Sequence, residues 1–248
     1  MIKIDQAEPH YDLVAHRGYP HKFPDNSLSG IRAALEAGAK FLEIDVQLST
    51  SGTPWLFHDE SLERVCAMGG SLVDMDDGAI GSLRASEAAR FGAQFADEPI
   101  ARLSQVITLL QEFPDAFVFV EIKPCSVQRS GAEQAVAAVA RELEPIRGRC
   151  TIISFSIPCL RAVAANTTLP HGIILETWEQ LKTDAQEFNN SHIFINYKKL
   201  PWDGSIDVGT QLAVYEVVDP VIARKLGARG CHFVETFDFP GLKAILKK

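Results

Sequence analysis

The chain lacks the features that mark membrane, secreted and nucleic-acid-binding proteins. No stretch of its 248 residues approaches the roughly 18 consecutive apolar residues of a membrane-spanning helix. Residues 1–12 contain no apolar core of the kind found in secretory signals. The net charge of −8 argues against nucleic acid or an anionic membrane surface as a partner. We therefore expect no integral membrane segment and no nucleic-acid partner.

Cysteine is scarce and unpatterned. The five cysteines are odd in number and scattered, without a CxxC motif. Reduced thiols in a cytoplasmic protein fit this usage best. The remaining composition, 46% hydrophobic and 23% charged, is ordinary for a globular protein. Because α/β barrels often reach this length as one unit, we expect a single domain over residues 1–248.

Short apolar runs alternate with amphipathic segments along most of the chain. Counted as strands, the runs begin the pattern at residues 13–15 and 41 onward, then recur at 117–122, 151–155, 172–175, 192–196, 212–218 and 231–236. Each is followed by a helix or helical segment. Eight such units in about 250 residues predict an α/β fold, the (β/α)₈ TIM barrel. Residues 59–102 are less regular, and we expect them to form a small insertion with one short helix after the second barrel strand.

Capping residues predict several helix boundaries. Asn26 or Ser27 is expected to begin the first helix, and Ser104 the helix that follows the insertion. Asp219 is expected to cap a late helix that Gly227 ends. A further helix is predicted around Trp178.

A predicted hairpin over residues 41–59 gathers acidic groups. Glu43 and Asp45 are two residues apart, so on a strand both carboxylates point to one face. The turn at residues 51–54 is too short for a parallel crossover, so the next extended run must return antiparallel and bring His58 toward the carboxylates. A hard divalent cation would relieve the repulsion between the two acids.

Other strand ends add charged groups, and barrel enzymes place their chemistry at those ends. Strand one ends at His16 and Arg17, and strand three at Glu121 and Lys123. Read separately, each is as well explained by a structural ion pair or a strand cap. Together with the hairpin they form a set that suits phosphoester hydrolysis. The other histidines have no comparable company and are expected at the surface or in structural roles: His10, His21, His171, His192 and His232.

The expected roles divide the set into three groups. Glu43, Asp45 and Glu121 are candidate ligands of a divalent metal ion, Mg²⁺ or Ca²⁺. Arg17 and Lys123 are candidate contacts of the substrate phosphate. His16 and His58 are candidate catalytic residues, one acting as acid and the other as base.

Five motifs in the same order resemble the glycerophosphodiester phosphodiesterases. They are VAHRG at 14–18, PDNSL at 24–28, GAKFLEIDVQLSTSG at 38–52, HD at 58–59 and EIK at 121–123. The resemblance implies a TIM barrel that hydrolyses a small-molecule glycerophosphodiester to sn-glycerol 3-phosphate and an alcohol with a bound Mg²⁺ or Ca²⁺ ion. By motif position, it implies the same roles for the seven residues.

The chain departs from the family pattern in three places. Residues 25–27 read Asp-Asn-Ser where the family usually has Glu-Asn-Thr. Residues 215–218 read Tyr-Glu-Val-Val where a Trp-Thr-Val-Asn-like run is common. The terminal Thr-Asp-x-Pro run has one extra residue here, Phe237. The second departure bears on the choice of substrate.

Two other functions stay open from the sequence. A lysophospholipase D-like phosphodiesterase would need apolar residues from 60–102 or 198–206 to line a groove. A non-catalytic phosphate-ligand binding barrel would need the cations and metal but no pair of histidines. The sequence leaves open which histidine is the acid, whether water or the glycerol hydroxyl attacks, which alcohol leaves and what the oligomeric state is.

Overall fold

The computed structural model describes residues 11–188, 191–204 and 206–247, and its described part contains a closed barrel of parallel strands. The sheet has nine strands in the order β1-β9-β8-β7-β6-β5-β4-β2-β3, and β1 also pairs with β2. That last pairing closes every strand except β3 into the barrel. The strands are β1 (Asp12–His16), β2 (Phe41–Leu48), β3 (Pro54–Leu56), β4 (Phe117–Ile122), β5 (Cys150–Ser154), β6 (His171–Leu175), β7 (His192–Asn196), β8 (Gln211–Tyr215) and β9 (Phe233–Thr236). The TIM-barrel prediction is confirmed.

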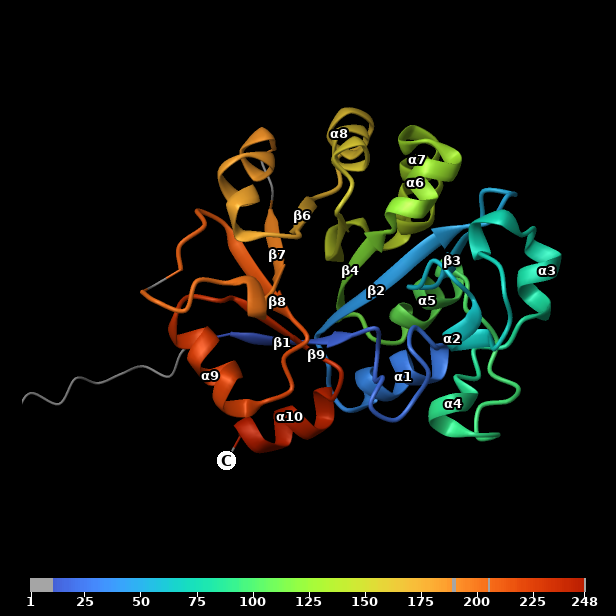
Figure 1. The fold of residues 1–248 in the computed structure, drawn as a ribbon, viewed down its shortest axis with the longest axis horizontal. Helices are drawn as coiled ribbons and strands as arrows, with labels where there is room; N and C mark the ends of the chain where they lie inside the picture. The colour runs from blue at the N-terminus through green and yellow to red at the C-terminus, as the bar shows by residue number, and fades with distance from the viewer. Residues whose placement is uncertain (1–10, 189–190, 205, 248) are drawn as a thin grey trace, which may run out of the picture.

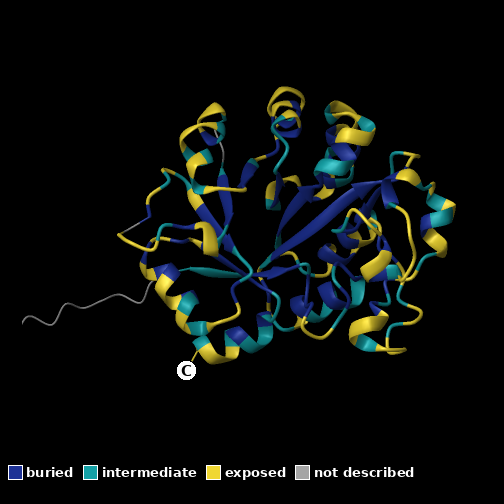
Figure 2. Ribbon diagram, in the orientation of Figure 1, coloured by how far each residue is buried: buried dark blue, intermediate teal, exposed yellow. Residues whose placement is uncertain are grey.

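Helices surround the barrel and cover the outward faces of its strands (Figure 1). They are α1 (Leu28–Glu36), α5 (Leu103–Gln111), α6 (Pro124–Ser130), α7 (Ala132–Leu143), α8 (Ile157–Asn166), α9 (Pro220–Ala228) and α10 (Phe239–Leu246). On β2 the side chains of Leu42, Ile44 and Val46 pack toward these helices, since all three belong to the core cluster that includes α1, α5 and α7 residues. Buried strands inside a more exposed helical layer are visible in Figure 2.

Apolar side chains fill the amino-terminal part of the barrel interior, and polar side chains occupy its carboxyl-terminal part. A second cluster of buried residues packs within the barrel: Val14, Phe119, Ile153, Ile174, Phe194, Ala213 and Phe233. The inward positions that follow these along β1, β2, β4 and β9 carry ionisable side chains. Side chains therefore fill the floor of the barrel, and the polar groups gather at the carboxyl ends of the strands.

The predicted helix starts were partly right. Ser27 Oγ accepts a hydrogen bond from Gly30 N at 3.1 Å, and the Asp219 side chain accepts one from Val221 N at 2.7 Å. Ser104 was the wrong cap, because helix α5 already begins at Leu103, and the backbone N–H of Arg102 is capped by Gln105 Oε1 at 2.8 Å.

The end of α9 was also predicted wrongly. Gly227 lies inside the helix, which continues to Ala228. A Cβ at Gly227 would lie 2.1 Å from Tyr11 Cδ1, so the glycine permits close packing rather than ending the helix. The left-handed glycine of this turn is Gly230, with φ of +104°.

The β/α unit after β6 is less helical than predicted, whereas the loop expected after residues 192–196 is observed. The segment around Trp178 forms the 3₁₀ turns η3 (Trp178–Lys182) and η4 (Asp184–Glu187) instead of an α-helix. After β7, the described residues contain only the 3₁₀ turn η5 (Tyr197–Lys199) and then an irregular loop. The buried Arg229 donates hydrogen bonds to the carbonyls of Pro201, Gly204 and Asp203 and so holds this loop. Backbone carbonyls of the loop are thus satisfied without a helix.

The insertion contains three short α-helices where one was expected. It comprises α2 (Glu63–Cys66), η1 (Leu72–Asp74), α3 (Asp77–Ser82) and α4 (Ala88–Phe91). Its buried residues, among them Leu62, Leu72 and Ile80, pack on Trp55 and Phe57 of the hairpin as a separate small cluster. Helices of one turn carry too little periodicity for the sequence to reveal them.

All five cysteines are free thiols, as expected: Cys66, Cys125, Cys150, Cys159 and Cys231. Three of them are buried, and burial raises the pKa of Cys159 to about 12. Among the described residues, no helix has both the length and the apolar character needed to cross a membrane.

His192 in the barrel floor is expected to make folding sensitive to acid. Its ring lies 4.9 Å from Phe119, and burial lowers the pKa of His192 to about 4. Because the unfolded chain has the ordinary pKa of about 6.5, protonation below that pH favours unfolding. Between pH 7 and pH 5 this residue should remove about 2 kcal/mol from the free energy of unfolding. In urea denaturation, the free energy of unfolding of His192→Phe should decrease by about 2 kcal/mol less than that of the wild type between pH 7 and pH 5. His21→Phe, at an exposed position, should show the same decrease as the wild type. Equal falls in all three proteins would contradict the assignment.

Candidate active site

A cavity of about 380 Å³ lies at the carboxyl ends of the barrel strands. All of the residues predicted for the site line it except Asp45, which contacts the lining residues Arg17 and Lys123: His16, Arg17, Glu43, His58, Glu121 and Lys123. Its other wall is formed by later strands and their loops: Ile153, Phe155, Ile174, Glu176, Phe194, Asn196, Lys199, Tyr215, Glu216 and Glu235. The structure therefore brings the whole predicted set together.

Three carboxylates form the acidic centre. Glu43 and Asp45 lie on β2, and Asp45 is paired in register with Glu121 on the neighbouring β4. One oxygen from each residue lies within 4.8 Å of the others, and all three side chains are buried. Asp45 Oδ1 accepts no hydrogen bond from the described residues. Acidic oxygens gathered this closely, one of them unsatisfied, fit a hard divalent cation.

The pKa shifts of the acidic centre also favour a bound divalent cation. Burial, followed by the charges of Asp45, Glu235 and Glu121, raises the pKa of Glu43 well above its usual range. Burial also opposes ionisation of Asp45, but Arg17 and Lys123 outweigh it and hold the pKa of Asp45 well below its usual range. The protein thus supplies cations to one of the acids and leaves Glu43 with excess negative charge around it.

Arg17 and Lys123 border the carboxylates from two sides. Arg17 Nε lies 3.1 Å from Asp45 Oδ2, and Lys123 Nζ lies 2.9 Å from Glu121 Oε1 and 3.4 Å from Asp45 Oδ1. Although burial opposes it, the neighbouring carboxylates raise the pKa of Lys123 above its ordinary value. Arg17 has a φ of +54°, and its N–H donates to Glu43 O at 2.9 Å, so β1 turns sharply as it enters the site.

Asn26 anchors the loop after β1 to the acidic centre, a role that the sequence did not reveal. Its Nδ2 donates to Asp45 Oδ2 at 2.8 Å, and its Oδ1 accepts from Asp45 N at 3.1 Å. The backbone of Asn26 is left-handed, with φ of +58°, and its N–H donates to Arg17 O at 3.0 Å. Asparagine tolerates this conformation better than most residues. The asparagine within the PDNSL motif was the available signal.

His16 is enclosed and His58 is at the edge. The His16 side chain is 7% exposed, and its Nε2 lies 3.5 Å from Glu43 Oε2. Burial, and next to it the charge of Arg17, lowers the pKa of His16 well below the ordinary value. The His58 side chain is 33% exposed, and its Nδ1 lies 2.8 Å from Asp59 Oδ1. With Nδ1 bonded to Asp59, Nε2 is the nitrogen of His58 that remains for chemistry.

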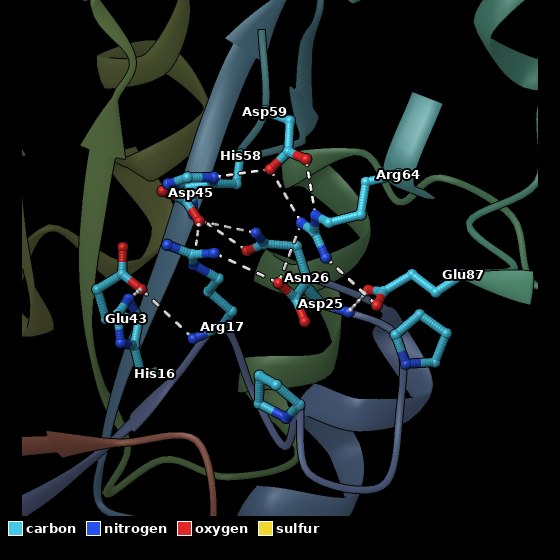
Figure 3. Close-up of polar contacts among 12 residues, drawn as sticks. His16, Arg17, Asp25, Asn26, Glu43, Asp45, His58, Asp59, Arg64 and Glu87 are labelled. Carbon is cyan, nitrogen blue, oxygen red and sulfur yellow. Dashed lines mark hydrogen bonds and ion pairs between the residues drawn. The ribbon is translucent and has the colours of Figure 1, made fainter. Parts of the chain in front are cut away.

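Salt bridges tie the insertion to both histidine-bearing loops (Figure 3). Arg64 contacts Asp59 at 2.7 Å and Asp25 at 3.2 Å, and Arg17 contacts Asp25 at 3.3 Å. Glu87, which is fully buried, accepts a hydrogen bond from Asp25 N at 2.6 Å. The insertion therefore holds the loops that carry Arg17 and His58.

The Glu87 carboxylate also pairs with Arg90, and we expect its removal to destabilise the protein. In Glu87→Ala the buried N–H of Asp25 and one face of Arg90 lose their acceptor. A buried unsatisfied donor costs about 1–3 kcal/mol, so the free energy of unfolding in urea should fall by that amount. The exposed Glu60→Ala should leave it unchanged. An unchanged midpoint for Glu87→Ala would show that water replaces the carboxylate.

Several residues of the site carried no role in the sequence analysis. Asp59 lay in the HD motif, and Glu235 was one of many acids at strand ends. Glu87 left no signal, because it directly precedes a one-turn helix in the irregular insertion and reaches the site only through tertiary contacts. His21, His171, His192 and His232 lie outside the cavity lining, as expected, and His10 lies outside the described residues.

A closed (β/α)₈ barrel with acids, histidines and cations at its carboxyl end places the chain in the class of barrel phosphodiesterases. The model of the Glycerophosphoryl diester phosphodiesterase family matches residues 16–232. The chain belongs to this family, and the resemblance seen in its motifs is confirmed.

Individual relatives support the assignment. The chain is 33% identical over 151 residues to a glycerophosphodiester phosphodiesterase of Caldanaerobacter subterraneus, covering 61% of this chain and 60% of the relative. It is 34% identical over 107 residues to glycerophosphodiester phosphodiesterase 1 of Mus musculus, covering 43% of this chain and 32% of the relative. These matches thus span less than two thirds of the relatives' lengths.

Solved structures match nearly the whole chain. An Oleispira antarctica phosphodiesterase, solved in complex with the product sn-glycerol-3-phosphate, superposes with a TM-score of 0.82 at 22% identity, covering 96% of this chain and 97% of that one. A Silicibacter pomeroyi protein described as a glycerophosphoryl diester phosphodiesterase gives a TM-score of 0.83 at 19% identity, covering 97% and 94%. At these identities the matches establish the shared fold.

Proposed function

We propose that this chain hydrolyses glycerophosphodiesters to sn-glycerol 3-phosphate and an alcohol. One observation carries the proposal: a cluster of three buried carboxylates within 4.8 Å of one another lies at a cavity that two histidines and two cations line. Membership of the phosphodiesterase family supports the reaction class, and the product bound in the Oleispira antarctica structure supports the product.

Glu43, Asp45 and Glu121 are the proposed metal ligands. Their oxygens are the donors that Mg²⁺ and Ca²⁺ prefer, and their mutual repulsion would be relieved by a divalent cation. When bound, such an ion supplies Lewis acidity to the phosphate oxygens. Arg17 and Lys123 would neutralise further phosphate charge, because they are the two cations that border the acidic centre.

His16 and His58 are the proposed acid–base pair. One removes a proton from the nucleophile, which is water or the glycerol hydroxyl, as its oxygen bonds to phosphorus, and the other donates a proton to the departing alkoxide as its bond to phosphorus breaks. Attack by the glycerol hydroxyl would form a cyclic phosphate, which water then opens to give glycerol 3-phosphate. Both histidines line the cavity, with His16 beside Glu43 and His58 at the edge. A site that only bound phosphate would have no use for such a pair.

The lysophospholipase D-like alternative receives no support from the cavity lining. The apolar residues that line the cavity lie on β5, β6, β7 and β8 or directly after β5. None of them comes from residues 60–102. Trp202 packs near Lys225 and Arg229 rather than in the cavity.

The test is the release of glycerol 3-phosphate from a panel of glycerophosphodiesters and the matching lysophospholipids. Each is assayed with Mg²⁺, with Ca²⁺ and with EDTA. We expect release from glycerophosphodiesters that EDTA abolishes and one of the two ions restores. Full activity in EDTA would contradict the metal site, and faster turnover of lysophospholipids would favour the alternative. Glycerol 3-phosphate binding without turnover would favour a binding protein.

Two further parts of the proposal concern the whole chain. We propose that residues 1–248 form one domain, which the family match over residues 16–232 supports. A cytoplasmic location is proposed because the five thiols are unpaired, as a reducing compartment would keep them.

A further inference from the structure

Glu235 on β9 and Phe237 just after it contact His16, and neither belongs to the proposed metal ligands, phosphate contacts or acid–base pair. Glu235 Oε2 lies 3.7 Å from His16 Nδ1. The Phe237 ring is stacked on the imidazole, with centroids 4.6 Å apart and planes 16° from parallel. We propose that Glu235 and Phe237 are positioning residues that hold His16 by the edge and the face of its ring. The inference rests on the proposed function, since it concerns a histidine of that reaction.

Strand pairing explains why these two residues reach His16. β9 runs parallel to β1, with Glu235 opposite Val14 and Thr236 opposite Ala15. Side chains alternate along a strand, so Val14 and His16 share the inward face of β1. Glu235 is inward on β9 for the same reason, and Phe237 directly follows the last residue of β9, where its ring stacks on His16. The barrel therefore aims both side chains at His16.

No hydrogen bond within the described residues explains the burial of the Glu235 carboxylate. Its side chain is 2% exposed, and Oε1 has no hydrogen-bond partner there. It also adds a fourth carboxylate to a site that already contains Glu43, Asp45 and Glu121. A buried carboxylate without hydrogen bonds destabilises a fold. His16 Nδ1 also lacks a hydrogen-bond partner, and the nearest Glu235 atom is Oε2, the other oxygen of the same carboxylate.

A small movement would join them. The distance of 3.7 Å exceeds a hydrogen bond by less than 1 Å, and hydrogen bonds of catalytic groups are often long before substrate binds. Once Nδ1–H donates to Glu235, Nε2 is fixed as the nitrogen that faces Glu43 and the cavity. His58 has the matching arrangement, because Asp59 lies at its Nδ1.

Phe237 packs against both His16 and Arg17. It is the extra residue of the terminal motif, and its ring also lies 5.6 Å from the Arg17 guanidinium carbon. The Tyr215 ring meets His16 edge-on, with centroids 6.2 Å apart. His16 is thus bounded by Glu43, Glu235, Phe237 and Tyr215, which leaves the imidazole little freedom to rotate.

The kinetic test compares Glu235→Leu, Glu235→Gln and Phe237→Leu with the wild type, with the exposed Glu133→Gln as control. Glu235→Leu should lower kcat by about 10–100-fold, the usual effect of losing a carboxylate that orients a histidine. KM should change by less than about 3-fold, because no substrate contact is lost. Glu235→Gln retains an acceptor oxygen and should restore most of kcat. Phe237→Leu should lower kcat less than Glu235→Leu.

A second readout does not need turnover. In protein labelled with ¹⁵N-histidine, the His16 signals are assigned by their absence in His16→Asn. We expect the Nδ1–H tautomer in the wild type and a mixture of tautomers in Glu235→Leu. If the wild type hydrolyses no glycerophosphodiester, the proposed function fails and the tautomer alone decides the inference. Thermal unfolding checks the fold, and Glu235→Leu should melt no lower than the wild type because a buried charge is removed.

Four results would each overturn the inference. An unchanged kcat in Glu235→Leu, or an unchanged tautomer, would show that Glu235 does not position His16. A rise in KM at constant kcat would make Glu235 a substrate contact. A loss of Mg²⁺ affinity in calorimetric titration of the variant would make it a fourth metal ligand.

Discussion

Replacing His58 by alanine is expected to lower kcat by a factor of about 10²–10⁴, the usual contribution of a positioned general acid or base. His58 lines the cavity, and its Nδ1 is 2.8 Å from Asp59, so Nε2 is the nitrogen available for proton transfer. His16→Ala should lower kcat to a similar extent, because the proposed mechanism assigns each histidine to a different oxygen of the same reaction. The loss should appear in kcat under saturating substrate and metal.

The control for both variants is His21→Ala, which removes an exposed imidazole that does not line the cavity. It should retain wild-type kcat and KM. The folded state of each variant is checked by thermal unfolding, where His58→Ala should match the wild type because this side chain is one-third exposed. A His58→Ala enzyme with full kcat would remove His58 from the mechanism, and the same result for His16 would remove His16.

Replacing Glu43 by glutamine is expected to abolish metal binding while leaving the metal-free fold intact. The wild-type protein should gain about 2.7 kcal/mol of stability at a metal concentration of 100 Kd, and the variant should gain almost none. Glutamine keeps an oxygen for the N–H of Arg17, which lies 3.3 Å from Glu43 Oε2, but removes one charge from the acidic centre. Without metal, Glu43→Gln should therefore unfold at the same or a higher temperature than the wild type.

Activity should fall together with metal affinity. Lewis-acid stabilisation is worth several kcal/mol, so kcat/KM of Glu43→Gln should decrease by on the order of 10²-fold or more. The control is Glu133→Gln, which makes the same substitution at an exposed position on α7. It should keep the wild-type activity and the wild-type stabilisation by metal. If Glu43→Gln were still stabilised by Mg²⁺ or Ca²⁺ to the wild-type extent, the carboxylate cluster would not be the metal site.

Much of the fold was predictable because strands buried on both faces leave continuous apolar runs. Strands such as 117–122 and 192–196 were predicted with the observed bounds. The site was predictable for a related reason: parallel strands bring their carboxyl ends to one edge. Glu43, Asp45 and Glu121 could therefore be placed together from spacing alone, without knowing any helix.

The parts that escaped prediction depend on contacts between distant segments. The N–H of Asp25 binds Glu87, 62 residues further along the chain. Glu235 meets His16 only because β9 pairs with β1 to close the barrel. Gly227 was misread because the same residue that ends many helices also permits close packing, here against Tyr11. Local pattern cannot distinguish these cases.

Helices cover one half of the barrel more completely than the other, so the two halves are expected to differ in local stability. α1, α5, α6 and α7 shield β1, β2 and β4, which carry the acids and His16, whereas the described parts after β6 and β7 offer only 3₁₀ turns and a loop. Local opening free energies follow the packing that covers a strand. Amide hydrogens of β6 and β7 should exchange with solvent before those of β2 and β4. The part of the cavity lined by Ile174 and Phe194 is therefore expected to open locally more often than the part formed by β2 and β4.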